Sequence, residues 1–209
     1  MVHNIIPSKM THPNKPQWRS RAVIVIIALL SAIPFGLAWY VANHPEWIDS
    51  RSNYGHLVIP PRPLAYAELF AHPVSPAASL ADLKGRWILL QVASGPCGAA
   101  CAETLHKTHQ VRLMVNKDIA RVKRLLLIPK GGNSAEFETL LRGDEALVAA
   151  GASEAMTRSL AEALGKPPTE DMVFILDPLA NLILWYEGGF DPYGLLKDLK
   201  HLLKASQIG

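Results

Sequence analysis

An uncharged stretch of twenty residues is the feature that most restricts how this chain folds. It begins at Ala22, ends at Val41 and contains no Asp, Glu, Lys or Arg. As a helix it spans about 30 Å, at about 1.5 Å per residue, which matches the hydrocarbon core of a membrane. Pro34 and Gly36 interrupt the stretch, and both residue types are tolerated in membrane helices. The sequence therefore predicts one transmembrane helix over residues 22–41.

The charges on either side of this stretch predict its orientation. Residues 1–21 contain four Lys or Arg and no Asp or Glu, whereas Glu46 and Asp49 follow the stretch. Because positive charges stay on the cytoplasmic side, we expect a cytoplasmic tail over residues 1–21 and everything after about residue 42 outside. The alternative is a cleaved signal peptide. Its apolar region has about 7–15 residues and ends at a small-x-small site, and this stretch is longer and lacks such a site.

The charge balance excludes a nucleic-acid partner. The whole chain has 21 basic and 18 acidic residues, a net charge of +3. Without the four basic residues of the tail, residues 22–209 contain 17 basic and 18 acidic residues, a net charge of −1. The outer part therefore lacks the basic excess that binds nucleic acid.

The outer part divides into a spacer and one domain. Residues 42–79 contain six prolines, which predicts an extended spacer. The apolar side chains of residues 57–64 leave a second interpretation open, in which this part lies against the domain as an irregular edge. Residues 80–209 are long enough for one domain with one core.

Apolar and polar patterns predict an α/β order in this domain. Two apolar runs and a β-rich pair joined by an Asp-Pro turn predict strands over residues 86–93, 121–128, 172–176 and 182–186. Helical patterns cover residues 97–116, 134–141 and 153–164, and a final helix begins at Asp191 and Pro192. Two crossovers followed by a hairpin and a closing helix are typical of a thioredoxin-like fold.

The only two cysteines, Cys97 and Cys101, follow the first of these strands after a Ser-Gly-Pro turn. On a helix this spacing places both sulfurs on the same side. The N–H groups and the dipole of the first helical turn lower the pKa of a thiol there. A lowered pKa favours disulfide exchange and equally favours Cu(I), for which thiolates are preferred ligands. Cys97 and Cys101 are therefore the predicted catalytic pair and the predicted Cu(I) ligands, and sequence physics leaves both uses open.

Other residues near the pair are weaker candidates. Glu103 and Asp171 are candidate proton acceptors, although a surface position explains both. His106 and His109 are expected to be solvated helix residues rather than metal ligands. Pro168 is the nearest candidate for a cis-proline that faces the thiols.

The Cys-x-x-x-Cys pair after this strand resembles the Sco/SenC family of membrane-anchored, thioredoxin-fold copper chaperones for cytochrome oxidase. A Ser-Leu-Ala-Asp-Leu-Lys-Gly-Arg segment before the strand and a Leu-Asp-Pro turn in the late hairpin support the resemblance, which covers residues 79–204. The layout of the whole chain is similar to small Sco-like transmembrane proteins of proteobacterial oxidase biogenesis. Two departures stand out. Ala102 replaces the proline that follows the second cysteine in the family, and residues 167–172 lack the family's histidine ligand. Only Cys97 and Cys101 therefore carry over.

The resemblance implies a protein of the bacterial inner membrane with a periplasmic domain. Its implied role is to assist cytochrome c oxidase assembly through thiol-disulfide exchange, Cu(I) transfer or both, with oxidase subunits or other copper and thiol assembly factors as partners. As an enzyme it would be at most a thiol-disulfide oxidoreductase. The alternative is a non-catalytic assembly factor in which the Cys97–Cys101 disulfide is structural. A bridge that closes a three-residue loop constrains the unfolded chain very little, which weighs against that alternative.

Overall fold

The computed structural model describes residues 17–44, 53–71, 80–93, 95–128, 137, 139, 141, 144 and 146–206. The chain divides into two compact units, one up to Arg51 and one from Ser52 to Gly209.

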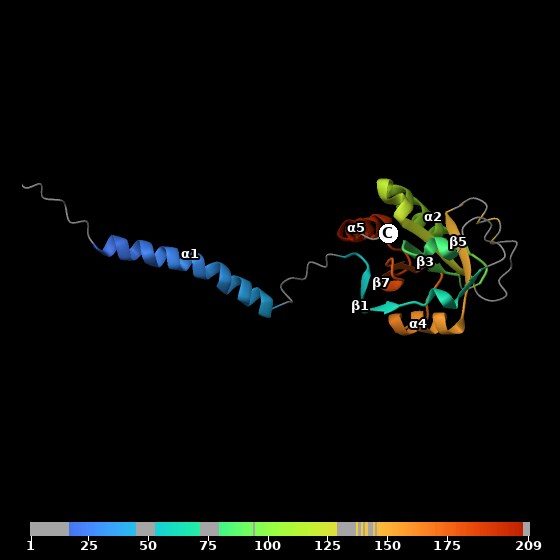
Figure 1. Cartoon of the computed structure of the whole chain (residues 1–209), viewed down its shortest axis with the longest axis horizontal. Coiled ribbons are helices and arrows are strands. Elements are labelled where there is room, and N and C mark those ends of the chain that lie inside the picture. Colours follow the sequence, from blue (N-terminus) through green and yellow to red (C-terminus); the bar gives the residue numbers. More distant parts are fainter. Residues whose placement is uncertain are drawn as a thin grey trace, which may run out of the picture. The chain divides into compact units, whose positions relative to one another are not determined.

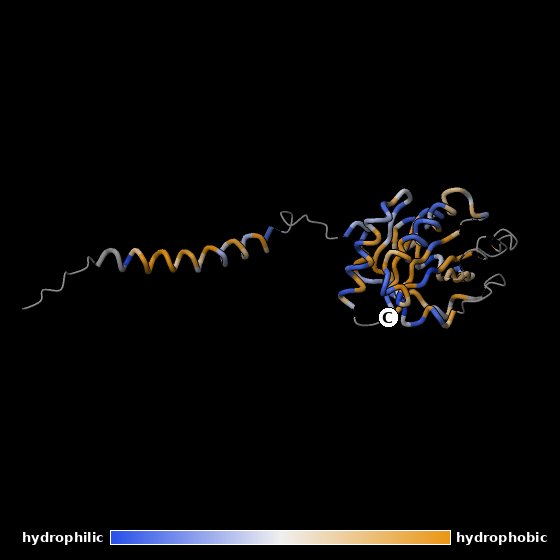
Figure 2. The backbone as a smooth tube through the Cα atoms, turned by 90° about the horizontal axis from the view of Figure 1, so that it is seen from above, coloured by the Kyte–Doolittle hydropathy of each residue, from blue (hydrophilic) through white to orange (hydrophobic). Residues whose placement is uncertain are grey.

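The described residues of the first unit form the helix α1 (Gln17–Asn43). Its residues 21–40 are all exposed, and apolar residues dominate its middle part (Figure 2). The part from Arg21 to Asn43 is long and apolar enough to cross a membrane, by length and composition. The predicted helix over residues 22–41 lies inside it, and Pro34 does not end it.

The second unit is built on one sheet. In the described part of the chain, seven strands lie in the order β1-β7-β6-β3-β4-β5-β2. The strands are β1 (His56–Pro63), β2 (Leu69–Ala71), β3 (Trp87–Val92), β4 (Val122–Ile128), β5 (Leu147–Ala152), β6 (Val173–Leu176) and β7 (Asn181–Tyr186). The pairs β3–β4 and β4–β5 are parallel, and the other pairs are antiparallel.

Helices cover both faces of this sheet (Figure 1). The helix α4 (Glu154–Leu164) packs on one face through Met156 and Leu160. The helices α2 (Ala99–Met114) and α5 (Pro192–Ala205) pack on the other face and contact each other. The central strands β3, β4 and β6 are therefore buried on both sides, which agrees with their mainly apolar sequences.

The ends of α4 and α5 form as their sequences predict. The Ser153 hydroxyl accepts a hydrogen bond from the Met156 N–H, and Gly165 ends α4 with a φ of 70°. The Asp191 carboxylate accepts from the N–H groups of Tyr193 and Gly194 at the start of α5. The α/β class, the strands 86–93 and 121–128, the late hairpin and the last two helices are thus confirmed.

The spacer prediction over residues 42–79 is wrong for residues 53–71. Val58 and Leu64 are buried in the same core as α4, and β1 pairs with β7 at the edge of the sheet. Prolines fit there because an edge strand has an outer side on which no N–H is needed. The second interpretation, that residues 57–64 form an edge of the domain, is the arrangement found.

The start of the domain is fixed to the last helix. The N–H groups of Tyr54 and Gly55 donate to Oδ2 of Asp198 in α5, at 2.7 and 3.0 Å. The Tyr186 hydroxyl donates to the same oxygen at 2.6 Å, and Asp198 is only 4% exposed. Asp198 therefore joins the entry of the chain into the domain to β7 and α5.

Two further predictions differ from the structure, and a third is mostly not covered by it. The helix predicted over residues 97–116 begins at Ala99, so Cys97 precedes it, and it continues after Met114 into the 3-10 helix η4 (Asn116–Arg121). Within the described residues the only cis peptide bond precedes Pro60, so Pro168 is not a cis-proline. Most of the helix predicted over residues 134–141 lies outside the described residues, and β5 was not predicted.

Candidate redox site

The two cysteines lie where β3 leads into α2. Ala93 ends the strand with a hydrogen bond from its N–H to the Leu127 carbonyl, at 2.8 Å. Cys97 precedes the N-cap residue Gly98, and Cys101 is in the first turn of α2. The two sulfurs form a disulfide with an S–S distance of 2.01 Å and a Cα–Cα distance of 5.2 Å. The predicted pair is therefore brought together, although only Cys101 belongs to the helix.

The two cysteines differ in their exposure. Cys101 is 0% exposed and belongs to a buried cluster with Leu126 and Ala149, on the side of the sheet that α2 covers. Cys97 is partly exposed and packs against the same cluster. Of the two residues, therefore, only Cys97 reaches the protein surface.

The helix start favours a thiolate once the disulfide is reduced. Gly98 has no side chain to accept a hydrogen bond from the first-turn N–H groups of α2. These N–H groups and the positive end of the helix dipole stabilise negative charge at this position. A reduced Cys97, next to Gly98, lies where low-pKa cysteines are found.

Gln91 of β3 is a part of the site that sequence reasoning missed. Its side chain is 2% exposed, and its amide Nε2 donates to the Cys101 carbonyl at 3.1 Å and to the Glu170 carbonyl at 2.9 Å. Its Oε1 is buried without a hydrogen-bond partner among the described groups. Gln91 therefore fastens the loop around Glu170 to the first turn of α2. The available signal was a single amide within an otherwise apolar strand.

A carboxylate lies against the backbone between the two cysteines. A Cβ placed on Gly98 would be 3.6 Å from Oε1 of Glu170, so this carboxylate borders the N-cap of α2. The two acidic residues chosen from the sequence lie elsewhere. Glu103 is ion-paired with Lys107 at 2.7 Å, and the Asp171 carboxylate packs against Gly188. Glu170 is thus the acidic residue found beside the N-cap between the two cysteines.

An ion network holds α2 one turn beyond Cys101. Arg124 of β4 is 2% exposed, donates to the Leu105 carbonyl at 2.6 Å and to the Thr108 hydroxyl at 3.0 Å, and pairs with Asp144. His109 lies 2.9 Å from the same Asp144 oxygen. Burial and the nearby arginines lower the pKa of His109, which favours its uncharged form beside the Arg124–Asp144 pair.

The site offers two sulfur ligands to a metal ion. The described residues contain no group of three or more His, Cys, Asp or Glu side chains placed to hold a metal. His109 is engaged by Asp144, His56 stacks on Trp185, and His106 is exposed. His72, a further histidine outside the helices, lies outside the described residues. Among the residues that the structure describes, the donor set therefore consists of two thiolates with no third side-chain ligand beside them.

Comparison with known proteins defines the relatives of this domain. A family described as a transmembrane-like, thioredoxin-like, C-terminal domain matches residues 87–206. No protein of curated function matches the sequence.

The domain is similar to several solved structures. One is ScoI of Arabidopsis thaliana with copper bound, which is 14% identical with a TM-score of 0.47; the match covers 60% of this chain and 89% of that chain. ScoI of Bradyrhizobium japonicum with copper bound is 19% identical, with a TM-score of 0.43, covering 58% of this chain and 87% of that chain. A thiol:disulfide interchange protein of Chlorobium tepidum TLS is 14% identical, with a TM-score of 0.49, covering 69% of this chain and 95% of that chain.

The matched residues extend from β3 through α5 and include the disulfide, Gln91 and Glu170. Because they make up more than half of the sequence, the chain belongs to the family with a transmembrane-like, thioredoxin-like C-terminal domain.

Proposed function

We propose that this protein is a membrane-anchored thiol-disulfide exchange protein that acts through Cys97 and Cys101. The observation that carries the proposal is their unequal burial: Cys97 is partly exposed and Cys101 is 0% exposed. A purely structural bridge does not need one accessible sulfur, whereas exchange needs one sulfur that partners reach and one that resolves the mixed disulfide.

The proposed reaction reduces a partner disulfide. The Cys97 thiolate attacks one sulfur of the partner, which breaks the partner's S–S bond and forms a mixed disulfide. The Cys101 thiolate then attacks the Cys97 sulfur, so the partner leaves as a dithiol and the Cys97–Cys101 disulfide remains. Glu170 accepts the proton that the Cys101 thiol loses in this step. Two electrons pass to the partner, and a dithiol reductant protein restores the reduced pair.

Cu(I) transfer is the second candidate function, favoured by the two adjacent sulfurs at one helix start. The reduced pair would bind Cu(I) as two thiolates and release it to a copper-receiving partner. Both activities suit cytochrome c oxidase assembly, the role that the resemblance to the Sco/SenC family implies. Since residues 167–172 contain no histidine, the thiol reaction is the primary proposal.

The proposed location follows from α1 and its flanking charges. Residues 1–21 would stay in the cytoplasm, α1 would cross the bacterial inner membrane once, and the domain would face the periplasm. An oxidising compartment of this kind is where a disulfide persists.

Two matched variants of the full-length protein test the exchange. In Cys101→Ser the exposed Cys97 is expected to form a lasting mixed disulfide with a disulfide-bonded peptide. In Cys97→Ser the buried Cys101 is expected to form none. Equal trapping by the two variants would contradict the proposed roles.

Two measurements on the unmodified chain separate the remaining alternatives. A reduction potential below about −300 mV would mark the bridge as structural and favour a non-catalytic assembly factor. Anaerobic titration of the reduced protein with Cu(I) tests the second function. Binding no tighter than in Cys97→Ser would exclude Cu(I) transfer.

A further inference from the structure

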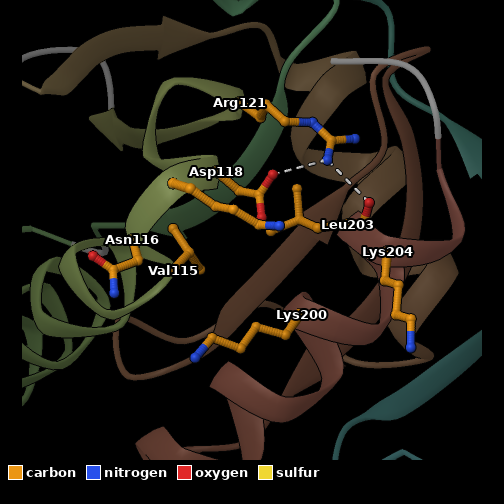
Figure 3. A pocket seen from close by; sticks show the side chains of 8 residues that line it. Val115, Asn116, Asp118, Arg121, Lys200, Leu203 and Lys204 are labelled. Atoms are coloured by element: carbon orange, nitrogen blue, oxygen red, sulfur yellow. Dashed lines mark hydrogen bonds and ion pairs between the residues drawn. The ribbon is translucent and has the colours of Figure 1, made fainter.

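A basic pocket of about 980 Å³ lies between η4 and the C-terminal half of α5 (Figure 3). Lys200 and Lys204 extend from α5 on one side of it, and Arg121 and Asp118 of η4 lie on the other. The pocket is lined by Val115, Asn116, Lys117, Asp118, Arg121, Lys200, Leu203 and Lys204. We call its four basic residues, Lys117, Arg121, Lys200 and Lys204, the basic groove.

The positive charge of the basic groove is largely uncompensated. Asp118 is the single carboxylate that lines the pocket, and it is paired with Arg121 at 3.2 Å. Among the residues that the structure describes, no ion pair joins Lys117, Lys200 or Lys204 to a carboxylate. The groove therefore presents three ammonium groups to an anion.

Arg121 keeps the two walls of the groove together. Its guanidinium donates to the Leu203 carbonyl at 3.0 Å and to the Ser206 carbonyl at 2.9 Å, which satisfies acceptors at the end of α5. The lysines have no such structural task in the described contacts. Lys204 also complements the negative end of the α5 dipole, but Lys117 and Lys200 lie outside the last turn of that helix.

The groove continues a basic face along α5. After Tyr193, the exposed residues of α5 are Lys197, Lys200, His201, Lys204 and Ala205. Four of these residues are basic. At about 100° per residue, they fall within an arc of about 100° around the helix axis: Lys197, Lys200, His201 and Lys204. The exposed side of α5 is thus mainly basic, whereas residues 22–209 carry a net charge of −1.

The chain enters the domain on this same helix. The Tyr54 ring lies against Gly194, where a Cβ would be 2.8 Å from its ring carbons, and Lys197 donates to the Tyr54 hydroxyl at 2.9 Å. Only nine residues separate Asn43, at the end of α1, from Asn53. Nine residues span about 30 Å at full extension. The covalent link to the proposed anchor therefore starts at the end of the basic face of α5.

We propose that the basic groove binds the phosphate headgroups of anionic lipids in the membrane that anchors the chain. This inference rests on the proposed membrane anchor. Charge complementarity selects the ligand, and the short link keeps the domain close to a lipid surface. Each lysine near an anionic surface increases membrane association about fivefold, so three together suffice to hold a tethered domain in one orientation.

The test uses the full chain in nanodiscs of phosphatidylcholine, and in nanodiscs of equal parts phosphatidylcholine and phosphatidylglycerol. A pulse of an acetylating reagent followed by mass spectrometry gives the reaction rate of each lysine. Lys117, Lys200 and Lys204 are expected to react several-fold more slowly in the anionic discs, and high salt is expected to remove this protection. Lys84 serves as an internal control on another part of the surface.

A matched pair of charge reversals completes the test. Lys200→Glu/Lys204→Glu is expected to remove the protection of Lys117. The control Lys84→Glu/Arg158→Glu changes the net charge equally but on other elements, and it is expected to retain the protection. Far-UV circular dichroism checks the folding of both variants.

The outcomes separate this proposal from the proposed function. Equal lysine reactivity in both lipid compositions would overturn the lipid site, favour an acidic protein surface as the ligand and leave the exchange function intact. A chain that does not remain with the discs during gel filtration would overturn the anchor and the lipid site together.

Discussion

Replacement of Gln91 by methionine tests whether the redox site depends on a buried amide. Gln91 is 2% exposed, and its Nε2 bridges the carbonyls of Cys101 and Glu170 at 3.1 and 2.9 Å. Gln91→Met keeps an unbranched side chain of similar size but removes both hydrogen bonds. The loop around Glu170 then loses its attachment to the first turn of α2.

The expected loss of stability follows from these contacts. Two hydrogen bonds at about 1 kcal/mol each, with two buried acceptors left behind, cost about 3 kcal/mol. The Oε1 of Gln91 has no hydrogen-bond partner among the described groups, so its removal returns about 1 kcal/mol. Gln91→Met is therefore expected to lower the free energy of unfolding by about 2 kcal/mol.

Urea unfolding of the oxidised full-length protein in nanodiscs, followed by tryptophan fluorescence, measures this change. The rate at which dithiothreitol reduces the disulfide gives the functional consequence, which we expect to be faster because the loop covers the first turn of α2 less tightly. Leu89→Met is the control: it lies in the same strand, contacts a different cluster and is expected to cost less than about 1.5 kcal/mol. If Gln91→Met matches the unmodified protein in both stability and reduction rate, the bridge has no role in the site.

Three further changes test the rest of the structure. Asp198→Ala removes three hydrogen bonds from one buried oxygen and is expected to destabilise the domain by about 3 kcal/mol; Tyr186→Phe removes one of the three, and an equal loss in both variants would contradict the shared role. Gly194→Ala places a Cβ 2.8 Å from the Tyr54 ring and is expected to lower the free energy of unfolding by about 1–3 kcal/mol. It is also expected to increase proteolysis near residue 54, and the control Gly95→Ala is expected not to do so. The pKa of His109 is lower in the folded protein than in the unfolded chain. The stabilisation that His109 gives the folded protein is therefore complete above the unfolded pKa and is lost as the pH falls through the folded pKa. The stability of His109→Asn should therefore fall less on acidification, and an unchanged pH profile would refute this.

Local sequence signals predicted the elements whose ends or faces they determine. The mainly apolar runs identified β3 and β4, and the caps Ser153 and Asp191 identified α4 and α5. The cysteine pair was equally local, because three residues and one helix start bring the two sulfurs together.

The parts that were missed depend on contacts between distant residues. β1 contains three prolines, so its composition indicates a spacer, and it becomes a strand because β7 lies beside it and pairs with it. Glu170 reaches the redox site because Gln91 holds its loop, 79 residues further along the chain. The spacing of residues in the sequence does not predict either of these two long-range contacts.

The helix α2 relates the two proposed sites to each other. Its first turn holds Cys101 of the disulfide, and its C-cap residue, Val115, lines the pocket that contains the basic groove. A helix of 16 residues is about 24 Å long, so the disulfide and the pocket lie at opposite ends of α2, about that far apart along its axis. Lipid headgroups bound in the groove would therefore leave the disulfide uncovered. Lipid binding and thiol exchange could then take place in the same molecule at the same time, without competition for one surface.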